Sequence, residues 1–377
     1  MHFELTPEQE ELRATTARFL EETMPVSGLR ALWESDADLG EWWARSADLG
    51  WTSMFGPEEL GAGSLSGQPT TDAVILAEEI GRGAAPGPFH AVNAFVAALT
   101  TRGSEDRQAE WLPAVLGGAV IGTWAFAEAH DAWSPAELAT SIAVEGDDVV
   151  VTGSKHYVES VADAELLLVT GVGNGGLTQV VVPAGTAGVV VHPGRSIDLS
   201  RTFGAVDFDA VRVPRDHLLG APGGAAEDVE RLLQVVLVLQ SAEMHGAAGR
   251  VFDATVEYAK DRYAFGRPIG SFQALKHRFA DMLQRLEFSR AISDGAARAI
   301  DVDDDAARLA RVAKCYVADA ALDIVDDCVQ INGGIGITWE HDAHVFSRRI
   351  ALDRALWGSP ELYKEELAGM LGMEGVR

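Results

Sequence analysis

A short segment around residue 265 combines residue types that can bind a diphosphate and a purine ring. It runs from Tyr258 to Gln273, reads YAKDRYAFGRPIGSFQ, and places a Gly-Arg-Pro turn between two predicted helices. The guanidinium groups of Arg262 and Arg267 could hold phosphate oxygens through paired hydrogen bonds, with the neighbouring aromatic rings beside an adenine. A salt-bridged corner between two helices would use the same residues, so the segment by itself leaves both interpretations open.

The glycine-rich stretch 330–336, which reads QINGGIG, is a second candidate. Glycines end helices and also let another backbone or a ligand approach closely. Taken alone, this stretch predicts the C-terminal cap of a helix rather than a binding site.

A third stretch, 171–176, reads GVGNGG and matches the G-x-G-x-x-G pattern of dinucleotide sites. Such a site needs a following helix, because the N-terminus of that helix holds the pyrophosphate. Residues 177–183 read LTQVVVP instead, which is typical of a strand. We therefore predict a hairpin turn here and no nucleotide-binding loop.

Other kinds of catalytic or metal site find little support. His341 and His344 are three residues apart and could share a helix face, but no third ligand is near them and the sequence has no H-E-x-x-H. No G-x-S-x-G elbow is present. The two cysteines, Cys315 and Cys328, lie in one helical stretch, so we expect neither a disulfide scaffold nor a metal site.

The pattern of predicted helices and strands around these segments indicates an α+β multi-domain chain. Residues 1–118 are expected to be all-helical, beginning with a capping box at Thr6 and Gln9. Residues 119–222 change to short period-two strands, which indicate a β-barrel or sandwich. Residues 223–377 predict a helical bundle with long helices over 227–260, 272–300 and 306–329. The acidic run 301–305 is expected to be a solvated loop between two of these helices.

The excess of acidic residues argues against nucleic acids and anionic membranes as binding partners. Lysine and arginine number 30 and aspartate and glutamate 57, for a net charge of −27. A surface this acidic repels nucleic-acid backbones and anionic membranes. The longest aliphatic runs fall far short of the roughly 20 residues that span a bilayer, and the first residues lack a basic-then-apolar signal pattern. We therefore expect a cytoplasmic protein.

Together, the order of these segments and the helical, β, helical layout closely resemble the acyl-CoA dehydrogenase family, over nearly the whole chain. That family is FAD-dependent and has three domains in this order. The resemblance is also carried by shorter motifs at 49–51 (LGW), 57–63 (PEELGAG), 77–81 (AEEIG), 151–155 (VTGSK) and 206–214 (VDFDAVRVP).

The resemblance implies an FAD site at a subunit interface, and hence an oligomer. Arg262 and Phe265 match positions that in the family contact the ADP half of FAD, and Gln273 matches the glutamine of the same motif. The other matching positions belong to the segment that in the family reaches the FAD of a neighbouring subunit; they are Gln330, Gly333 and Gly334.

The expected catalytic base is missing from both places in which the family carries it. The reaction removes a proton from Cα and a hydride from Cβ of an acyl thioester, the hydride going to flavin N5, and the proton needs a carboxylate within hydrogen-bond reach. The first place is a Glu-Gly-Thr stretch about two dozen residues after the double glycine, where this chain has Trp357. The second lies 29 residues before Phe265, where it has Val236 in an apolar run.

The β segments that face the flavin in the family also differ. The family's Thr-Glu-Pro and its Gly-Ser-Asp loop are replaced by Ala127-Glu128-Ala129 and a loop, 130–135, that reads HDAWSP. A threonine whose hydroxyl approaches flavin N5 falls at Glu159, and a carboxylate there would disfavour the anionic reduced flavin. Glu243 lies two helical turns, about 10 Å, beyond Val236, so we expect an ion pair or hydrogen bond for it rather than the role of base.

These observations predict the base-lacking subunit of an acyl-CoA dehydrogenase complex. The family includes actinobacterial α2β2 assemblies, associated with CoA thioesters of bulky substrates such as steroid side chains, in which a sibling subunit carries the base. In such an assembly this chain would supply the ADP side of the FAD site to an oxidoreductase active only with its partner. Two alternatives remain: a self-sufficient homo-oligomeric acyl-CoA dehydrogenase with an atypical base, and a flavin-free structural member of the fold.

Overall fold

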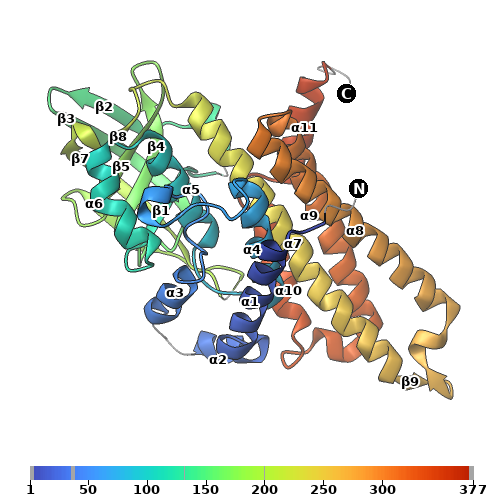
Figure 1. The fold of residues 1–377 in the computed structure, drawn as a ribbon. Coiled ribbons are helices and arrows are strands. Elements are labelled where there is room, and N and C mark those ends of the chain that lie inside the picture. Colours follow the sequence, from blue (N-terminus) through green and yellow to red (C-terminus); the bar gives the residue numbers. More distant parts are fainter. Residues whose placement is uncertain (1–3, 35–38, 131, 199, 373–377) are drawn as a thin grey trace.

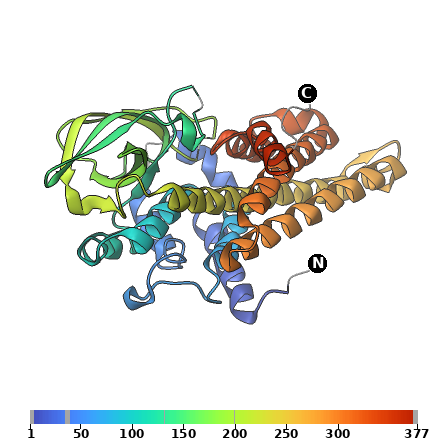
Figure 2. The same ribbon diagram turned by 90° about the horizontal axis from the view of Figure 1, so that it is seen from above.

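A computed structural model describes residues 4–34, 39–130, 132–198 and 200–372 of the chain. Helices of the N-terminal third lie against a sheet formed by the middle third, and a bundle of longer helices follows (Figure 1). Seen from above, two of the bundle helices extend well away from the sheet (Figure 2). The expected α+β order of helices, sheet and helices is confirmed.

The N-terminal helices enclose a core rich in tryptophan. They are α1 (Pro7–Thr23), α2 (Val26–Glu34), α3 (Gly40–Ala47), α4 (Pro69–Gly83), α5 (Phe89–Arg102) and α6 (Glu105–Leu116), with the short 3-10 helix η1 (Glu58–Leu60) before α4. The predicted capping box starts α1, because the Thr6 hydroxyl accepts from the Gln9 backbone and the Gln9 side chain accepts from the Thr6 backbone. Trp51 at the centre of this core is fully buried.

Eight strands of the middle third form one sheet in the order β6-β7-β3-β2-β4-β5-β8, with β1 parallel to β4. Their bounds are β1 (Gly122–Ala125), β2 (Ser141–Glu145), β3 (Asp148–Glu159), β4 (Leu166–Gly173), β5 (Gly176–Pro183), β6 (Val189–Pro193), β7 (Phe203–Pro214) and β8 (Leu218–Leu219). The 3-10 helices η2 (Pro135–Glu137) and η3 (Arg215–His217) lie between strands. The last N-terminal helix, α6, ends at Leu116 and the first strand, β1, begins at Gly122.

The G-x-G-x-x-G match is a hairpin, as predicted. Gly173 pairs with Gly176 across the β4–β5 turn, and no helix follows. The two turn residues, Asn174 and Gly175, have φ of 50° and 82°, which is the backbone of a tight Asn-Gly turn.

The C-terminal bundle contains α7 (Ala226–Asp261), α8 (Gln273–Val302), α9 (Ala306–Asn332), α10 (Ala343–Ala355) and α11 (Pro360–Met370). The hairpin β9 (Tyr263–Ala264) and β10 (Arg267–Pro268) and the 3-10 helix η4 (Ile269–Ser271) connect α7 to α8, and η5 (Gly333–Ile337) follows α9. Among the helices of the described residues, none is long and apolar enough to cross a bilayer.

Glycines bring α4 and α7 unusually close together. A Cβ atom on Gly81 would lie 2.0 Å from the Glu243 carbonyl oxygen, and one on Gly246 would lie 2.1 Å from the Glu78 carbonyl oxygen. Neither contact is possible for a real side chain, so only glycine permits this crossing. The crossing fixes the position of Glu243 relative to the N-terminal helices.

The prediction of a solvated loop over 301–305 is wrong for its first two residues, which end α8. Asp301 belongs to α8, and its carboxylate accepts hydrogen bonds from the backbone N–H groups of Thr70 (2.9 Å) and Thr71 (2.8 Å). The first N–H groups of a helix have no partner inside the helix, so an acidic side chain from elsewhere can cap them. Asp301 thereby connects α8 to the start of α4.

Candidate functional site

The two segments assigned to the ADP half of FAD lie near each other at the far end of the bundle, where α7 and α9 end (Figure 1). Asn332 of α9 donates to the Thr255 hydroxyl (3.0 Å), and the Tyr258 hydroxyl donates to the Asn332 carbonyl (3.4 Å). Both partners belong to the last two turns of α7, directly before Arg262. Packing at the end of the bundle therefore brings together two segments that are about 70 residues apart in the chain.

The side chains of this surface are strongly exposed. Phe265 is 95% exposed, with the left-handed φ of 52°, and Tyr263 is 64% exposed. Arg262, Gln273, Gln330, Gly333 and Gly334 are exposed as well. A Cβ atom would meet nothing within 4 Å at Gly333 or Gly334, so another molecule can approach the backbone here.

The salt-bridged corner considered for this segment is not what forms. Within the part of the chain that the structure describes, neither Arg262 nor Arg267 makes an ion pair, and the Arg267 guanidinium lies 4.0 Å from the centre of the Phe272 ring. An exposed arginine without a carboxylate partner, beside open glycine backbone and aromatic rings, suits a diphosphate and a purine. These residues fit the ADP half of FAD, and the assignment of the six residues to it stays a prediction.

Two of the departures from the family pattern, Trp357 and Trp133 of the 130–135 loop, meet in one aromatic cluster, which Trp124, Phe126 and Tyr157 complete. The Trp357 ring is stacked on the Trp124 ring, with centres 4.9 Å apart and planes at 28°. Trp133, from the altered 130–135 loop, lies 5.7 Å from Trp357 and is stacked at 5.5 Å on Tyr157.

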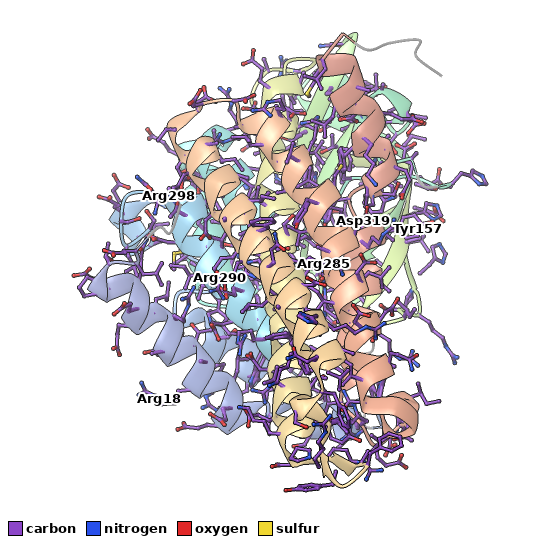
Figure 3. The ribbon with its side chains drawn as sticks, turned by 90° about the vertical axis from the view of Figure 1, so that its right-hand side faces the viewer. Arg18, Tyr157, Arg285, Arg290, Arg298 and Asp319 are labelled. Carbon is purple, nitrogen blue, oxygen red and sulfur yellow. The ribbon has the colours of Figure 1, made fainter. Side chains whose placement is uncertain are left out.

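The three tryptophans of the aromatic cluster are buried. Trp124, Trp133 and Trp357 are 2%, 7% and 5% exposed. Tyr157, near the end of β3, is 41% exposed and is labelled in Figure 3.

The backbone at Trp357 is held in an unusual conformation. Its φ is 61°, in the left-handed region that side chains other than glycine avoid. The Tyr363 hydroxyl donates to the Trp357 carbonyl, and the Lys314 ammonium donates to the carbonyls of Leu356 (2.8 Å) and Asp353. Burial lowers the pKa of Lys314 to about 7, although Asp353 opposes that shift.

Directly beside the aromatic cluster lies a buried charge cluster of Glu159, Asp198, Arg201, Glu243, Arg349 and Asp353. Arg201 bridges Glu159 and Asp353, with both distances 2.6 Å, and its guanidinium is 3.6 Å from Glu243. Arg349 pairs with both Asp198 and Glu243. All six side chains are at most 2% exposed, which is tolerable only because each charge has a partner.

Glu243 is a structural anion, as expected. Its two carboxylate oxygens are bonded to Arg349 and to His90. Burial alone would raise the pKa of Glu243, but Arg349, His90 and Arg201 outweigh burial and leave it well below the usual range. A carboxylate that binds protons so weakly and faces two guanidinium groups is unsuited to take a proton from carbon.

Two other carboxylates at positions that face the flavin in the family, Glu159 and Glu128, are also held by cationic partners. Glu159 is paired with Arg201, and Glu128 accepts from Lys155 (2.8 Å) and from the backbone N–H groups of Ala139 and Thr140. Burial lowers the pKa of Lys155 to about 8, against the pull of Glu128. Buried aromatic rings and ion pairs therefore surround the positions that in the family face the flavin ring.

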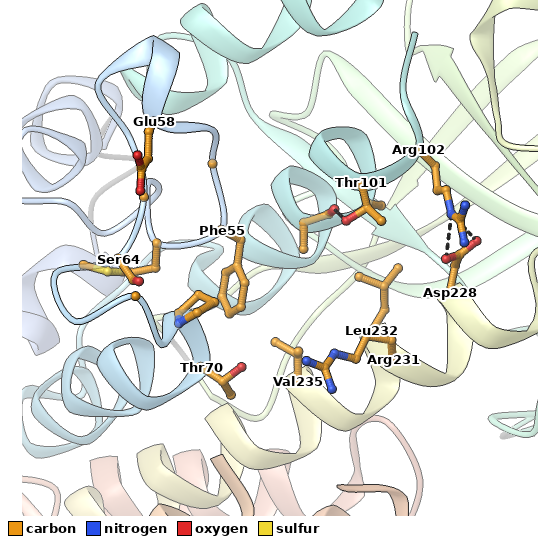
Figure 4. A pocket seen from close by; sticks show the side chains of 17 residues that line it. Phe55, Glu58, Ser64, Thr70, Thr101, Arg102, Asp228, Arg231, Leu232 and Val235 are labelled. Atoms are coloured by element: carbon orange, nitrogen blue, oxygen red, sulfur yellow. Dashed lines mark hydrogen bonds and ion pairs between the residues drawn. The ribbon is translucent and has the colours of Figure 1, made fainter. Parts of the chain in front are cut away.

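The other position at which the family carries a base, Val236, is completely buried and faces the core. Its neighbour Val235 lines a separate cavity of about 370 Å³ between α4, α5 and α7 (Figure 4). In that cavity Arg102 is paired with Asp228 at 2.8 Å, and Phe55 and Leu232 cover the apolar wall. Successive helix residues are about 100° apart, so this cavity opens on a different face of α7 from Val236.

Sequence reasoning missed most of the charge cluster. His90, Arg201 and the α10 pair Arg349 and Asp353 come from three segments more than 100 residues apart, and none belongs to a motif. The only usable signal was the presence of charged residues within otherwise apolar helices, as at Glu243. The loop that contains Trp133 was noted as a departure, but nothing in the sequence indicated that Trp133 stacks on Tyr157.

Comparison with known proteins identifies the family. The N-terminal domain model of acyl-CoA dehydrogenases matches residues 6–119, and the C-terminal domain model matches residues 228–371. The chain is 30% identical to acyl-CoA dehydrogenase IpdE2 of Mycobacterium tuberculosis, over 94% of this chain and 95% of that protein. It is 29% identical to IpdE2 of Mycolicibacterium smegmatis, over 94% and 96%.

Solved structures agree. Butyryl-CoA dehydrogenase from Megasphaera elsdenii has the same fold, with a TM-score of 0.90 at 22% identity over 98% of this chain and 100% of that one. A variant of the Tcur3481-Tcur3483 steroid ACAD has a TM-score of 0.87 at 25% identity, over 98% and 99%. The chain belongs to the acyl-CoA dehydrogenase family. FAD is the cofactor of this family, whose members are oxidoreductases that act on acyl-CoA thioesters and oligomerise.

Proposed function

We propose that this chain is the non-catalytic subunit of a heteromeric FAD-dependent acyl-CoA dehydrogenase, and that it contributes the ADP side of a shared FAD site. In this arrangement a sibling chain of the same fold supplies the carboxylate base and the surroundings of the flavin ring. FAD supplies the hydride acceptor for the α,β-dehydrogenation of the thioester when it is bound.

The observation that carries the proposal is the side chain at the base position. Trp357 cannot accept a proton, and it is buried against Trp124 rather than turned aside. Val236 at the other base position is equally unable to act. The carboxylates of Glu128, Glu159 and Glu243 are each paired with a lysine or an arginine, which disfavours their taking a proton from the substrate.

The residues of this chain would act by binding and orienting. The Arg262 guanidinium would hold the diphosphate, and the exposed Phe265 ring would lie beside the adenine. The open backbone at Gly333 and Gly334 would let the cofactor approach closely at the same end of the bundle. The exposure of Tyr263 and Phe265 supports a partner chain over this surface, because large exposed apolar side chains commonly mark an interface.

For the substrate we propose a CoA thioester with a bulky acyl group, such as a steroid side chain. The support is the likeness to the Tcur3481-Tcur3483 steroid ACAD, whose name joins two polypeptides. We also propose a cytoplasmic location; the two cysteines are buried free thiols, as is usual in a reducing compartment.

The test is co-expression with candidate sibling chains, followed by measurement of flavin per chain. We expect this chain alone to be colourless and inactive, and a complex with the right sibling to contain FAD and dehydrogenate an acyl-CoA. The variant Arg262→Gln in this chain should lower the flavin content of the complex, whereas the exposed control Arg195→Gln should not.

Two results would overturn the proposal. A yellow homo-oligomer that turns over acyl-CoA without a sibling would show a self-sufficient enzyme with an atypical base. A chain that acquires no FAD under either condition would be a structural member of the fold.

A further inference from the structure

The space between the family's base position and its N5-facing position is filled in this chain. We infer that Trp357 is a built-in plug, which together with Trp124 and Trp133 closes this chain's own flavin-ring site. An FAD whose ADP half is held by this chain then has its ring in the partner subunit. The inference rests on the proposed function and adds to it the reason why the chain cannot hold the ring.

The packing leaves no room for another ring. Stacked aromatic rings in proteins have centres about 4.5–7 Å apart, so a ring inserted between two others needs roughly 9 Å or more between the outer centres. The centres of Trp357 and Trp124 are 4.9 Å apart, and those of Trp357 and Trp133 are 5.7 Å apart. Phe126 closes a further side at 6.2 Å from Trp357.

The plug is fixed rather than mobile. Trp357 has a left-handed backbone, and such a conformation persists only when surrounding contacts impose it. Here Tyr363 holds the Trp357 carbonyl and Lys314 holds the carbonyl before it, at Leu356. Lys314 is itself completely buried and bonded to Gln240 of α7 (2.9 Å), so the segment is tied to the core of the bundle.

A buried ion pair occupies the position that in the family faces flavin N5. Glu159 and Arg201 form an ion pair of 2.6 Å, and each side chain is 2% exposed. Arg201 is further bound to Asp353, four residues before Trp357. A flavin ring could enter only by separating this buried pair, which leaves an uncompensated charge.

The experiment uses lumiflavin, the flavin ring without the ADP half, on the full chain alone. The result then depends on neither a partner nor the ADP-side residues. In Trp357→Gly the ring is removed at a position whose φ suits glycine, so the backbone is relieved while a cavity opens. The matched control is Trp111→Ala, which removes a buried indole (7% exposed) outside the aromatic cluster.

We expect Trp357→Gly to bind lumiflavin at least tenfold more tightly than the wild type or Trp111→Ala does, with quenching of flavin fluorescence and a rise in Tm. Equal binding by the wild type would overturn the inference, as would a folded Trp357→Gly that binds no better than Trp111→Ala.

A measurement on the wild type keeps the inference testable if the glycine variant does not fold. The stacked pair of Trp124 and Trp357 should give an exciton couplet in far-ultraviolet circular dichroism, which Trp357→Phe abolishes. We expect saturating FAD, with or without a sibling chain, to leave this couplet unchanged, and its disappearance would overturn the plug. Failure to acquire FAD with any sibling would instead defeat the proposed function and leave the lumiflavin result standing.

Discussion

Replacing Glu243 by glutamine separates a structural anion from a catalytic base. The carboxylate is 1% exposed and bonded to Arg349 and His90, with Arg201 at 3.6 Å. Removing one charge from a buried network leaves its partners uncompensated and typically costs about 3–5 kcal/mol. Domain stabilities are about 5–15 kcal/mol, so we expect Glu243→Gln to lower the urea midpoint by about a fifth or more.

The assay compares unfolding and turnover on the same preparations. Glu257→Gln is the matched control on α7, because Glu257 is 69% exposed and its pair with Lys260 should change stability by less than about 0.5 kcal/mol. In a complex with an active sibling, we expect Glu243→Gln to retain turnover per folded complex. A variant with the wild-type urea midpoint and no turnover would refute the reasoning, since it would make Glu243 the base.

Three further predictions concern the fold that holds the site. Asp301→Asn should cost about 1–2 kcal/mol in urea unfolding, because the amide caps the start of α4 without a charge; an unchanged midpoint would contradict the capping role. Gly81→Ala should lower the free energy of unfolding by at least about 3 kcal/mol, since the new Cβ would lie 2.0 Å from the carbonyl oxygen of Glu243 on the facing helix. The control Gly295→Ala, with open space around it, should raise the free energy of unfolding by about 0.5–1 kcal/mol. Burial lowers the pKa of His245 from 6.5 to about 4. As the pH falls, the unfolded chain therefore takes up the proton before the folded chain does, and the free energy of unfolding decreases between pH 6.5 and pH 4. His245→Gln should therefore show a smaller drop in Tm between pH 7 and pH 5 than the wild type, and an equal drop would show that other groups control the acid limit.

Local patterns accounted for the elements of the fold. The capping box at Thr6, the Asn-Gly hairpin at 174–175 and the long helices of the bundle are set by residues within a few positions of one another. Such features need no tertiary contact to be recognised. The loop prediction over 301–305 failed at Asp301, because the role of this residue depends on α4, more than 200 residues earlier.

For the candidate site as well, some features follow from the sequence and others only from the tertiary structure. The sequence by itself determined that no acidic residue occupies either base position and that the ADP-side motifs are intact, since both statements concern residue types at known spacings. Only the tertiary structure decided that Trp357, Trp133 and Trp124 pack into one cluster, and that Glu159 and Glu243 are paired with Arg201 and Arg349. Packing and electrostatic compensation are properties of three-dimensional neighbours, and these neighbours come from widely separated parts of the chain.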